Sequence, residues 1–294
     1  MTTENPTAIV TFEELPELSD DDRLLVPELE RAGVSAEAVV WSNNDVDWSR
    51  FGSVVIRSCW DYHHRAQEFL EWLGNVEQLR VPIWNRPNLI RWNQDKVYLR
   101  ELEMKGFPVV PTAWIDTGNA IDVPSLLQSR GWERAVVKPR VSASGHLTVL
   151  IDADSVGNDQ VDSVLGTDSG VLVQEYLPEI ETEGEWSLLF FNKQFSHAVL
   201  KRPRTGEFRV QVEHGGSFEA ATASRNFIDV AQAVVDSIQE PLLFARVDGV
   251  SLDGRFTLME LELIEPYLFF GVDRSAAWRF AEAFVNLQEA HLAW

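Results

Sequence analysis

The segment LMELELIEP, residues 258–266, places three glutamates inside an otherwise apolar run. The leucines and the isoleucine predict a buried strand, but a carboxylate removed from water is costly unless it is paired with a cation. Successive side chains of a strand alternate between its two faces, so Glu260 and Glu262 project together. Glu265 points the other way if the strand stays regular. The rest of the chain must therefore supply positive charge beside this segment.

The preceding segment, LLFARVDGVSLDGR, predicts the partner strand of a hairpin and carries Asp248. A two-residue Asp-Gly turn would set Asp248 opposite Met259, on the wrong face of the hairpin. A three-residue loop over 252–254 sets it opposite Leu258, on the face of Glu260 and diagonal to it. We expect the three-residue form.

Three carboxylates on one face repel one another strongly unless a cation lies between them. A small cluster of hard oxygen ligands suits magnesium or manganese. The same pattern is compatible with a surface strand whose acids face water, or with acids that are paired to arginine. This stretch alone does not separate these alternatives.

The acidic composition limits the partners of the chain. Its 294 residues carry 25 Lys and Arg against 46 Asp and Glu, a net charge of −21 that repels nucleic acid and anionic membranes. No run of about 18 apolar residues predicts a membrane span, and the first ten residues lack the pattern of a signal peptide. The single Cys59 excludes an internal disulfide and a multi-cysteine zinc site. We expect a cytoplasmic protein, and a homodimer is compatible with the sequence.

Alternating strand and helix patterns predict an α/β (α+β) fold. In residues 1–88 the alternation predicts a Rossmann-like domain with a parallel sheet. No G-x-G-x-x-G motif follows its strands, so a dinucleotide site is not expected. We expect a central subdomain over 89–172 and a C-terminal subdomain over 173–294. We also expect a helix over 93–107 and a strand over 206–216.

The histidines show no metal-ligand spacing, and we expect most of them to be structural. The ones considered are His63, His64, His146, His197 and His214. His146 lies in the small, polar segment VSASGHLT, residues 141–148, which predicts a mobile loop that could bring this side chain to a substrate.

The acidic strand resembles a known family signature. Its pattern E-L-E-L-I-E-P resembles the E-x-N-x-x-x-P signature of the bacterial glutathione synthetase group within the ATP-grasp superfamily. In that family the first acid, the asparagine and an aspartate of the neighbouring strand hold magnesium. The resemblance implies that Asp248, Glu260 and Glu262 hold Mg²⁺ or Mn²⁺. Glu262 stands at the asparagine position, where it adds a negative charge.

Further motifs follow in the order of that family between residues 84 and 272. WNRPNLIRWNQDKVYLREL and AVVKP resemble the segments that carry two nucleotide-binding lysines, and a glycine loop follows the second. VLVQEYLPEI resembles the adenine-binding linker, and EGEW lies near the position of a ribose-contacting acid. The residues that the resemblance assigns to ATP are Lys96, Lys138, Ser144, Gly145, Gln174, Glu175, Tyr176, Leu177 and Glu185.

A chain with this net charge must build a local positive site to bind ATP. GEFRVQVEHGG resembles a family motif that carries a phosphate-contacting arginine, here Arg209, whose planar fork suits a phosphoryl group. Lys201 and Arg246 are further catalytic candidates for the same region. Gln211 replaces the asparagine of that motif and is a candidate for substrate contact.

The segment IRSCWDYHHR follows a predicted strand, where α/β sheets place ligand loops. Arg57, Ser58 and Asp61 could hold an amino-acid-like substrate, with Arg57 at its carboxylate and Asp61 at its amine. Alternatively, Arg57 and Asp61 pair with each other.

Within the superfamily, the chain is most similar to the ATP-grasp ligases of cycloserine biosynthesis, which close O-ureidoserine into a ring. The resemblance implies an ADP-forming carboxylate–amine ligase that works through an acyl phosphate, between two molecules or within one. A small-molecule kinase on the same scaffold and a nucleotide-binding module without turnover are the alternatives.

Overall fold

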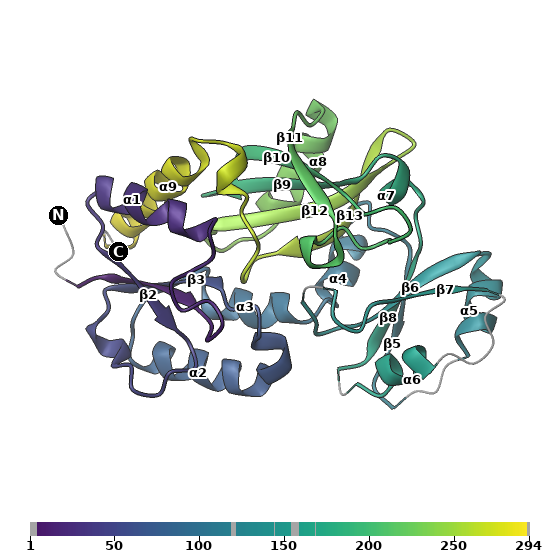
Figure 1. Ribbon diagram of the computed structural model, residues 1–294, viewed down its shortest axis with the longest axis horizontal. Coiled ribbons are helices and arrows are strands. Elements are labelled where there is room, and N and C mark those ends of the chain that lie inside the picture. The colour runs from purple at the N-terminus through teal and green to yellow at the C-terminus, as the bar shows by residue number, and fades with distance from the viewer. Residues whose placement is uncertain (1–4, 119–121, 144, 154–158, 168, 293–294) are drawn as a thin grey trace.

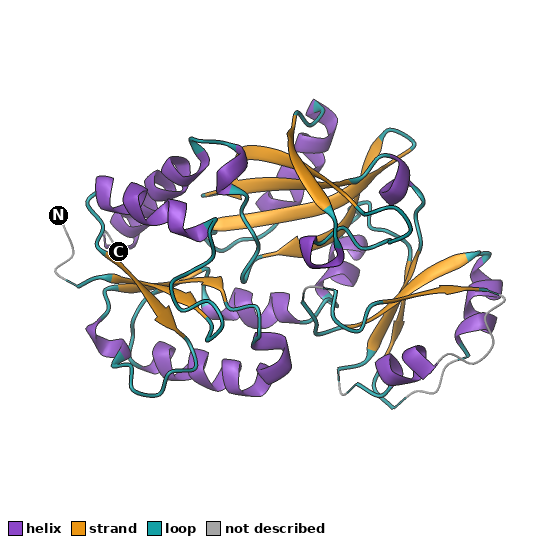
Figure 2. Ribbon diagram, in the orientation of Figure 1, coloured by secondary structure: helices purple, strands orange, loops and turns teal. Residues whose placement is uncertain are grey.

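The structure is a computed structural model that describes residues 5–118, 122–143, 145–153, 159–167 and 169–292. Over these ranges the chain forms three β-sheets with helices packed against them, a mixed α/β architecture (Figures 1 and 2). Within the same ranges, every helix is too short or too polar to span a bilayer.

The N-terminal part forms a four-stranded parallel sheet, which confirms the Rossmann-like prediction. Its two central strands are buried along their whole length, as expected of a parallel sheet whose faces are covered. In spatial order the strands are β2 (Ala36–Val40), β1 (Thr7–Thr11), β3 (Ser53–Ser58) and β4 (Ile83–Trp84), and the helices are α1 (Leu25–Arg31) and α2 (Ala66–Gln78).

The C-terminal part forms a five-stranded antiparallel sheet that ends in the acidic strand. Its strands in spatial order are β11 (Ser217–Ala221), β10 (Gln194–Arg202), β9 (Glu185–Phe191), β12 (Phe244–Leu252) and β13 (Arg255–Glu262). Its helices are α7 (Glu179–Thr182), α8 (Arg225–Asp236) and α9 (Ala276–Leu292).

The central part forms a smaller antiparallel sheet that stands to one side of the molecule (Figure 1). Its strands in spatial order are β5 (Thr112–Ile115), β8 (Val171–Glu175), β6 (Arg134–Pro139) and β7 (Val149–Asp152), with α5 (Val123–Arg130) and α6 (Asp159–Leu165) beside them.

Two helices replace the single helix expected over 93–107. They are α3 (Pro87–Gln94) and α4 (Tyr98–Met104), and the chain between them is not helical. Asp95 has an extended backbone at the end of α3, which interrupts the helical path. Leu99 and Leu102 of α4 pack in the core of the C-terminal sheet, although the sequence prediction placed this segment in the central subdomain.

The hairpin of β12 and β13 places the carboxylates on one face, but its turn and register differ from the predicted ones. The turn has two residues, Asp253 and Gly254, both with positive φ (51° and 74°), so the three-residue loop was wrong. A register shift next to Asp248 adds one residue to β13, as a β-bulge does. Asp248 therefore pairs directly with Glu260, and the predicted face is correct because the bulge restores the register that the shorter turn would have lost.

The outer edge of β13 is occupied by groups from the segment before the central sheet. The backbone of Leu258 exchanges hydrogen bonds with Pro108 O (2.8 Å) and Val110 N (3.0 Å). Farther along, Leu261 N donates to Tyr98 Oη (3.1 Å), and Asn93 bonds the backbone of Leu261 and Leu263 at 2.8 Å. Asn85 Nδ2 also donates to Leu263 O at 2.9 Å. These contacts fix the position of the acidic strand.

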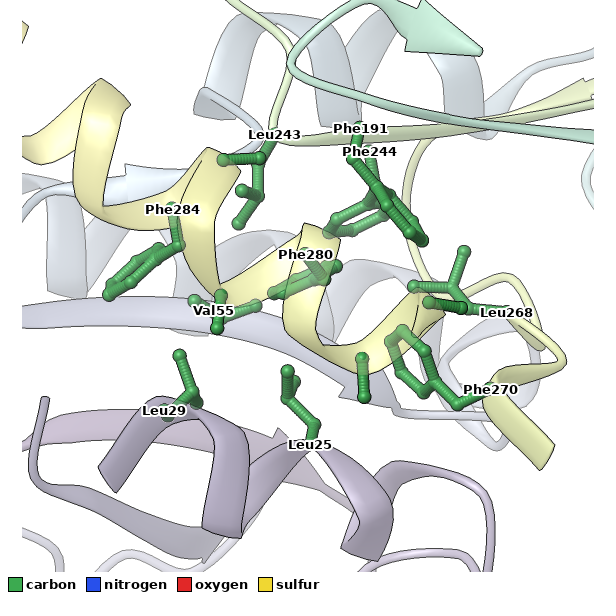
Figure 3. Close-up of a cluster of buried hydrophobic side chains, with 14 of the residues drawn as sticks. Leu25, Leu29, Val55, Phe191, Leu243, Phe244, Leu268, Phe270, Phe280 and Phe284 are labelled. Atoms are coloured by element: carbon green, nitrogen blue, oxygen red, sulfur yellow. The ribbon is translucent and has the colours of Figure 1, made fainter. Parts of the chain in front are cut away.

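Helix α9 joins the N-terminal and C-terminal sheets through one apolar core. Figure 3 shows Phe280 and Phe284 of α9 between Leu25 of α1 and Phe244 of β12. All four side chains are fully buried. The apolar contact area makes these two sheets one packed unit, which holds the N-terminal loops against the C-terminal strands.

Candidate active site

A cleft of about 700 Å³ is lined by residues of the central and C-terminal sheets and of the N-terminal loops. The acidic strand forms one wall, and the central sheet contributes Val136 and Lys138 from β6 and Gln174 from β8. The residues that the sequence singled out and that line this cleft are Lys96, Lys138, Gly145, Gln174, Glu185, Lys201, Arg209, Gln211, Arg246, Asp248, Glu260 and Glu262. Residues from widely separated motifs therefore share one cleft.

The acids of the hairpin share the cleft with a glutamate that was expected elsewhere. Glu260 and Glu262 each expose 27% of the side chain, whereas Asp248 exposes 2%. Strand β13 ends at Glu262, so the alternation of faces stops there, and Glu265 also lines the cleft. The expectation that Glu265 points away was wrong because the strand does not remain regular that far.

Lys96 lies between α3 and α4 rather than on a helix, and this break directs it inward. Its backbone N–H donates to Arg140 O at 3.0 Å, and its side chain is only 8% exposed. Its Nζ donates to Ser142 O at 2.5 Å and lies 3.1 Å from Glu260 Oε1. The lysine thus links the acidic strand to the start of the glycine loop.

Lys138 comes from β6, on the opposite wall of the cleft. Burial lowers the pKa of Lys138, although the charge of Glu260 opposes this effect and Lys96 adds to it. Among the described residues, no carboxylate lies within ion-pair distance of the Lys138 ammonium. A partly desolvated cation without such a partner is available to bind an anionic ligand.

Lys201 and Arg246 are engaged with acids of the cleft. Lys201 Nζ lies 2.5 Å from Glu185 Oε1 and 3.5 Å from Asp248 Oδ2. Arg246 binds Asp248 through Nε and Nη2 at 2.9–3.1 Å and reaches Glu262 Oε1 at 2.5 Å. The alternative of acids paired to arginine is thus part of this site.

The carboxylates are nevertheless crowded. Burial raises the pKa of Glu262 to about 7, with Glu260 and Asp248 adding to the effect and Arg246 opposing it. Burial also raises the pKa of Glu265 well above its ordinary value. Burial acts on Glu260 in the same direction, but Lys96 and Lys138 outweigh it and hold its pKa below its ordinary value. Two carboxyls that resist ionisation beside ionised neighbours indicate room for additional positive charge.

The segment over 206–216 is a loop with a short 3-10 helix, Val212–His214, rather than the expected strand. Arg209 forms a two-pronged ion pair with Glu207 at 2.8 and 3.0 Å, which orients its guanidinium at the cleft. Gln211 Oε1 is buried and has no hydrogen-bond partner among the described residues.

The glycine loop approaches that segment closely. Gly145 has a φ of +67°, and a Cβ atom built on it would lie 3.5 Å from Arg209 Cδ and 3.7 Å from Gln211 Oε1. Those distances are ordinary van der Waals contacts, so the backbone conformation rather than a lack of space favours glycine at this position. Ser144, the other residue predicted in this loop, lies outside the described residues.

The predicted adenine linker contributes one side chain to the cleft lining. Gln174 lines the cleft beside the apolar side chains of Val136 and Met259, whereas Glu175, Tyr176 and Leu177 are not among the lining residues. The hydroxyl of Tyr176 donates to Glu181, and Leu177 packs in an apolar cluster with Ile180 and Val250. Burial raises the pKa of Glu175.

The structure does not bring Arg57, Ser58 or Asp61 into the cleft lining. Arg57 is 1% exposed, and its Nε donates to Asp22 Oδ1 at 2.9 Å, while Ser58 Oγ donates to Asp22 Oδ2 at 2.5 Å. Asp61 accepts from Trp41 Nε1 at 2.8 Å. The alternative pairing of Arg57 with Asp61 was wrong, because the buried partner of Arg57 comes from the segment before α1.

Residues 102–272 match the ATP-grasp domain of prokaryotic glutathione synthetase. The chain belongs to the ATP-grasp ligases. Members of this family are ADP-forming carbon–nitrogen ligases that use ATP with a divalent metal ion. Residues 7–85 match the N-terminal domain of D-cycloserine synthetase DcsG.

Individual ATP-grasp proteins resemble this chain over most of its length. It is 32% identical to the cycloserine biosynthesis protein DcsG of Streptomyces lavendulae over 267 residues, 85% of this chain and 88% of that protein. The crystal structure of D-cycloserine synthetase DcsG superposes with a TM-score of 0.86 at 29% identity, covering 96% of this chain and 99% of the other. ATP-grasp ligase PsnB, in a complex with a precursor variant, Mg and ADP, shares the fold with a TM-score of 0.63 at 15% identity, covering 96% and 98%.

The cleft of this ATP-grasp chain fits a hard dication at Glu260 and Glu262. Both offer oxygen ligands on accessible carboxylates, and the charges of Glu260 and Asp248 add to the burial that raises the pKa of Glu262. Asp248 is bound by Arg246 and by Ser187 Oγ, so it also holds Arg246 in position. Its assignment as a metal ligand stays a prediction.

Sequence reasoning missed a group of N-terminal cleft residues. Ser19, Asp20 and Arg23 line the ATP-grasp cleft, with Arg23 Nη2 3.0 Å from Asp20 Oδ1. Trp60 and Tyr267 also line it, with ring centroids 6.3 Å apart. The available signal was the density of charge in the run SDDDR, residues 19–23, just before a short helix.

Proposed function

We propose that this protein is an ATP-dependent carboxylate–amine ligase that activates an amino-acid-like substrate as an acyl phosphate. The observation that carries the proposal is the meeting of Lys96, Lys138 and the carboxylates of β13 in one cleft. Lysine ammonium groups suit phosphate oxygens, and the acids suit the divalent cation that accompanies ATP. A site built only for a neutral ligand would not need this charge pattern.

In the proposed reaction, a carboxylate oxygen of the substrate attacks the γ-phosphorus of ATP, and the bond to the β,γ-bridging oxygen breaks. The products of this step are an acyl phosphate and ADP. A nitrogen nucleophile then attacks the acyl carbon, and inorganic phosphate leaves as the carbon–nitrogen bond forms. The nitrogen loses a proton in this step, and no covalent enzyme intermediate is required.

The side chains of the cleft divide this work. Lys96 and Lys138 would hold phosphate oxygens, and Arg209 would meet the charge that develops on the transferred group. Glu260 and Glu262 would hold Mg²⁺ or Mn²⁺, which supplies charge neutralisation for the leaving ADP. The glycine loop would exclude water, which matters because an acyl phosphate hydrolyses readily.

The finer proposal concerns the substrate. The identity to the cycloserine biosynthesis protein DcsG and the match of residues 7–85 to the N-terminal domain of that synthetase support intramolecular ring closure of O-ureidoserine. The N-terminal loops contribute Arg23, Asp20 and Trp60 to the cleft, and these offer a cation, a carboxylate and an apolar face. Such groups suit a small zwitterion better than a nucleotide.

The test is substrate-dependent ADP release coupled to identification of the product. O-ureidoserine is compared with a panel of amino acids, offered singly and in pairs, at saturating ATP and Mg²⁺. We expect ADP, inorganic phosphate and a new carbon–nitrogen bond in equal amounts. A stable phosphoester would instead indicate a kinase, and no ADP with any substrate would indicate a binding module. Ligation of amino-acid pairs but not of O-ureidoserine would contradict only the cyclisation.

A further inference from the structure

Three histidines that are far apart in the sequence meet beside the cleft. His63 and His64 belong to the 3-10 helix Tyr62–Arg65 of the N-terminal part, and His146 belongs to the glycine loop of the central part. Each offers a ring nitrogen, and these three atoms all lie within 4.8 Å of one another. The spacing of these histidines in the sequence does not predict this cluster, because the fold brings them together.

The side chains are held in this arrangement by local structure. The ring centroids of His63 and His64 are 3.9 Å apart, and His146 lies 4.6 Å from His64 and 5.3 Å from His63. The backbone N–H of His146 donates to Ala143 O at 2.9 Å, and Leu147 next to it has a φ of +50°. A leucine in the left-handed region is uncommon and indicates that the surrounding contacts impose this loop shape.

His63 hydrogen-bonds to the Trp60 backbone, but one of its ring nitrogens is left unsatisfied by the described residues. The Nδ1 atom of His63 is buried and has no hydrogen-bond partner among the described residues. Burial, followed by the charges of His64, His146 and Lys96, lowers the pKa of His63 to about 4. A neutral imidazole with a free lone pair is the form that binds transition metals.

We propose that His63, His64 and His146 form a transition-metal site, suited to Zn²⁺, that ties the glycine loop to the N-terminal domain. Imidazole nitrogens are preferred ligands of Zn²⁺, Cu²⁺ and Ni²⁺ and poor ligands of Mg²⁺. Zn–N bonds of about 2.0–2.1 Å in a tetrahedral site place ligand nitrogens roughly 3.4 Å apart, so the rings must approach by roughly 1 Å or less per ring. A water or a substrate atom would complete the coordination.

The histidine site is distinct from the oxygen cluster on β13. Metal binding at the histidines does not depend on the proposed ligase activity. Metal binding at the histidines would nevertheless affect the cleft. In the glycine loop that carries His146, Ala143 packs against the N-terminal core and Ser142 O accepts a hydrogen bond from Lys96. A metal ion at the three histidines would hold the loop in this closed position. The expected effect is slower opening of the loop, and hence slower release of whatever the cleft holds.

The first experiment measures Zn²⁺ binding by isothermal titration in the presence of millimolar Mg²⁺, which occupies hard oxygen ligands. We expect one Zn²⁺ per chain for the unaltered protein and at least about tenfold weaker binding for His146→Ala and for His64→Ala. His214→Ala removes a histidine of the neighbouring loop and should bind Zn²⁺ like the unaltered protein. His146 lies in a loop, so its replacement is not expected to affect folding, and thermal unfolding checks this.

The second experiment follows hydrogen exchange of backbone amides over 141–148, with and without Zn²⁺. The tether predicts slower exchange with Zn²⁺ in the unaltered protein and no change in His146→Ala. Absence of Zn²⁺ binding in the unaltered protein, or undiminished binding by His146→Ala, would overturn the metal site. Binding that leaves exchange of this loop unaltered would overturn the tether.

Discussion

The Nζ atom of Lys96 lies 3.1 Å from Oε1 of Glu260, across the cleft between the linker of α3 and α4 and the acidic strand. This contact joins the positive and negative halves of the site in one pair. Binding of ATP with its metal ion would separate them, because the lysine would turn to phosphate and the glutamate to the cation. In the proposed function, the two side chains of this pair therefore neutralise each other until the nucleotide and its metal ion bind.

Glu260→Gln should abolish most turnover while leaving the fold intact. The amide keeps the shape of the side chain but loses the charge that a divalent cation needs, and we expect a fall in kcat of at least about a hundredfold. Steady-state ADP release at several Mg²⁺ concentrations measures this. Glu282→Gln on the exposed face of α9 is the matched control and should be near normal. Near-normal turnover of Glu260→Gln would remove this residue from the metal site.

Lys138→Ala should weaken ATP binding by roughly tenfold or more, the loss of about 1.4 kcal/mol or more. Burial disfavours the charged lysine in the free protein, so its removal should leave the melting temperature unchanged or higher. Isothermal titration with a non-hydrolysable ATP analogue measures the affinity. The exposed Lys105→Ala is the control. An unchanged affinity in Lys138→Ala would reject the assignment.

Glu262 should make the stability of the metal-free protein depend on pH. Its folded pKa of about 7 exceeds the unfolded value, so the folded state binds the extra proton. The stability that this carboxyl contributes is present below the unfolded pKa of about 4.3 and is lost as pH rises through about 7. As pH rises over this range, the melting temperature of the unaltered protein should fall relative to that of Glu262→Gln.

The measurement is thermal unfolding in EDTA between about pH 5 and about pH 8. Comparison with Glu262→Gln cancels the contributions of other titrating groups. Added Mg²⁺ should reverse the trend, because it binds the deprotonated carboxyl. A difference that stays constant across the range would show that Glu262 titrates normally.

Arg57→Ala should lower the free energy of unfolding rather than alter the affinity for substrate. It removes the buried partner of Asp22, and breaking such a pair costs about 3–5 kcal/mol. The exposed pair of Arg50 with Glu37 is the control, since Arg50→Ala should cost less than about 1 kcal/mol. Urea unfolding compares the two variants. A stable Arg57→Ala with a raised KM for the amino-acid substrate would restore the substrate role.

Arg23→Ala should raise the KM for the amino-acid substrate and leave the KM for ATP unchanged. Arg23 lines the cleft from the N-terminal side and is more than half exposed, so its loss should not change the stability. Initial rates with each substrate varied in turn separate the two constants. Equal changes in both KM values would argue against a substrate contact.

The sequence predicted the parts of the site that depend on strand periodicity and motif order. The common face of Glu260 and Glu262 follows from the alternation of side chains along a strand, and the parallel N-terminal sheet follows from the alternation of strand and helix patterns. The turn of the hairpin was mispredicted because a bulge beside Asp248 depends on tertiary contacts. Asp22, the partner of Arg57, lies 35 residues away in sequence, and no local sequence pattern predicts this pair. The histidine cluster escaped prediction for the same reason.

The edge contacts of β13 also limit how two copies of this chain can associate. A strand at the edge of a sheet ordinarily offers its free N–H and C=O groups to another molecule. Here Asn93, Tyr98 and the backbone around Pro108 already use those groups. A second copy cannot extend the sheet past the acidic strand without first displacing this segment, so a homodimer would have to form through another surface and leave each cleft intact.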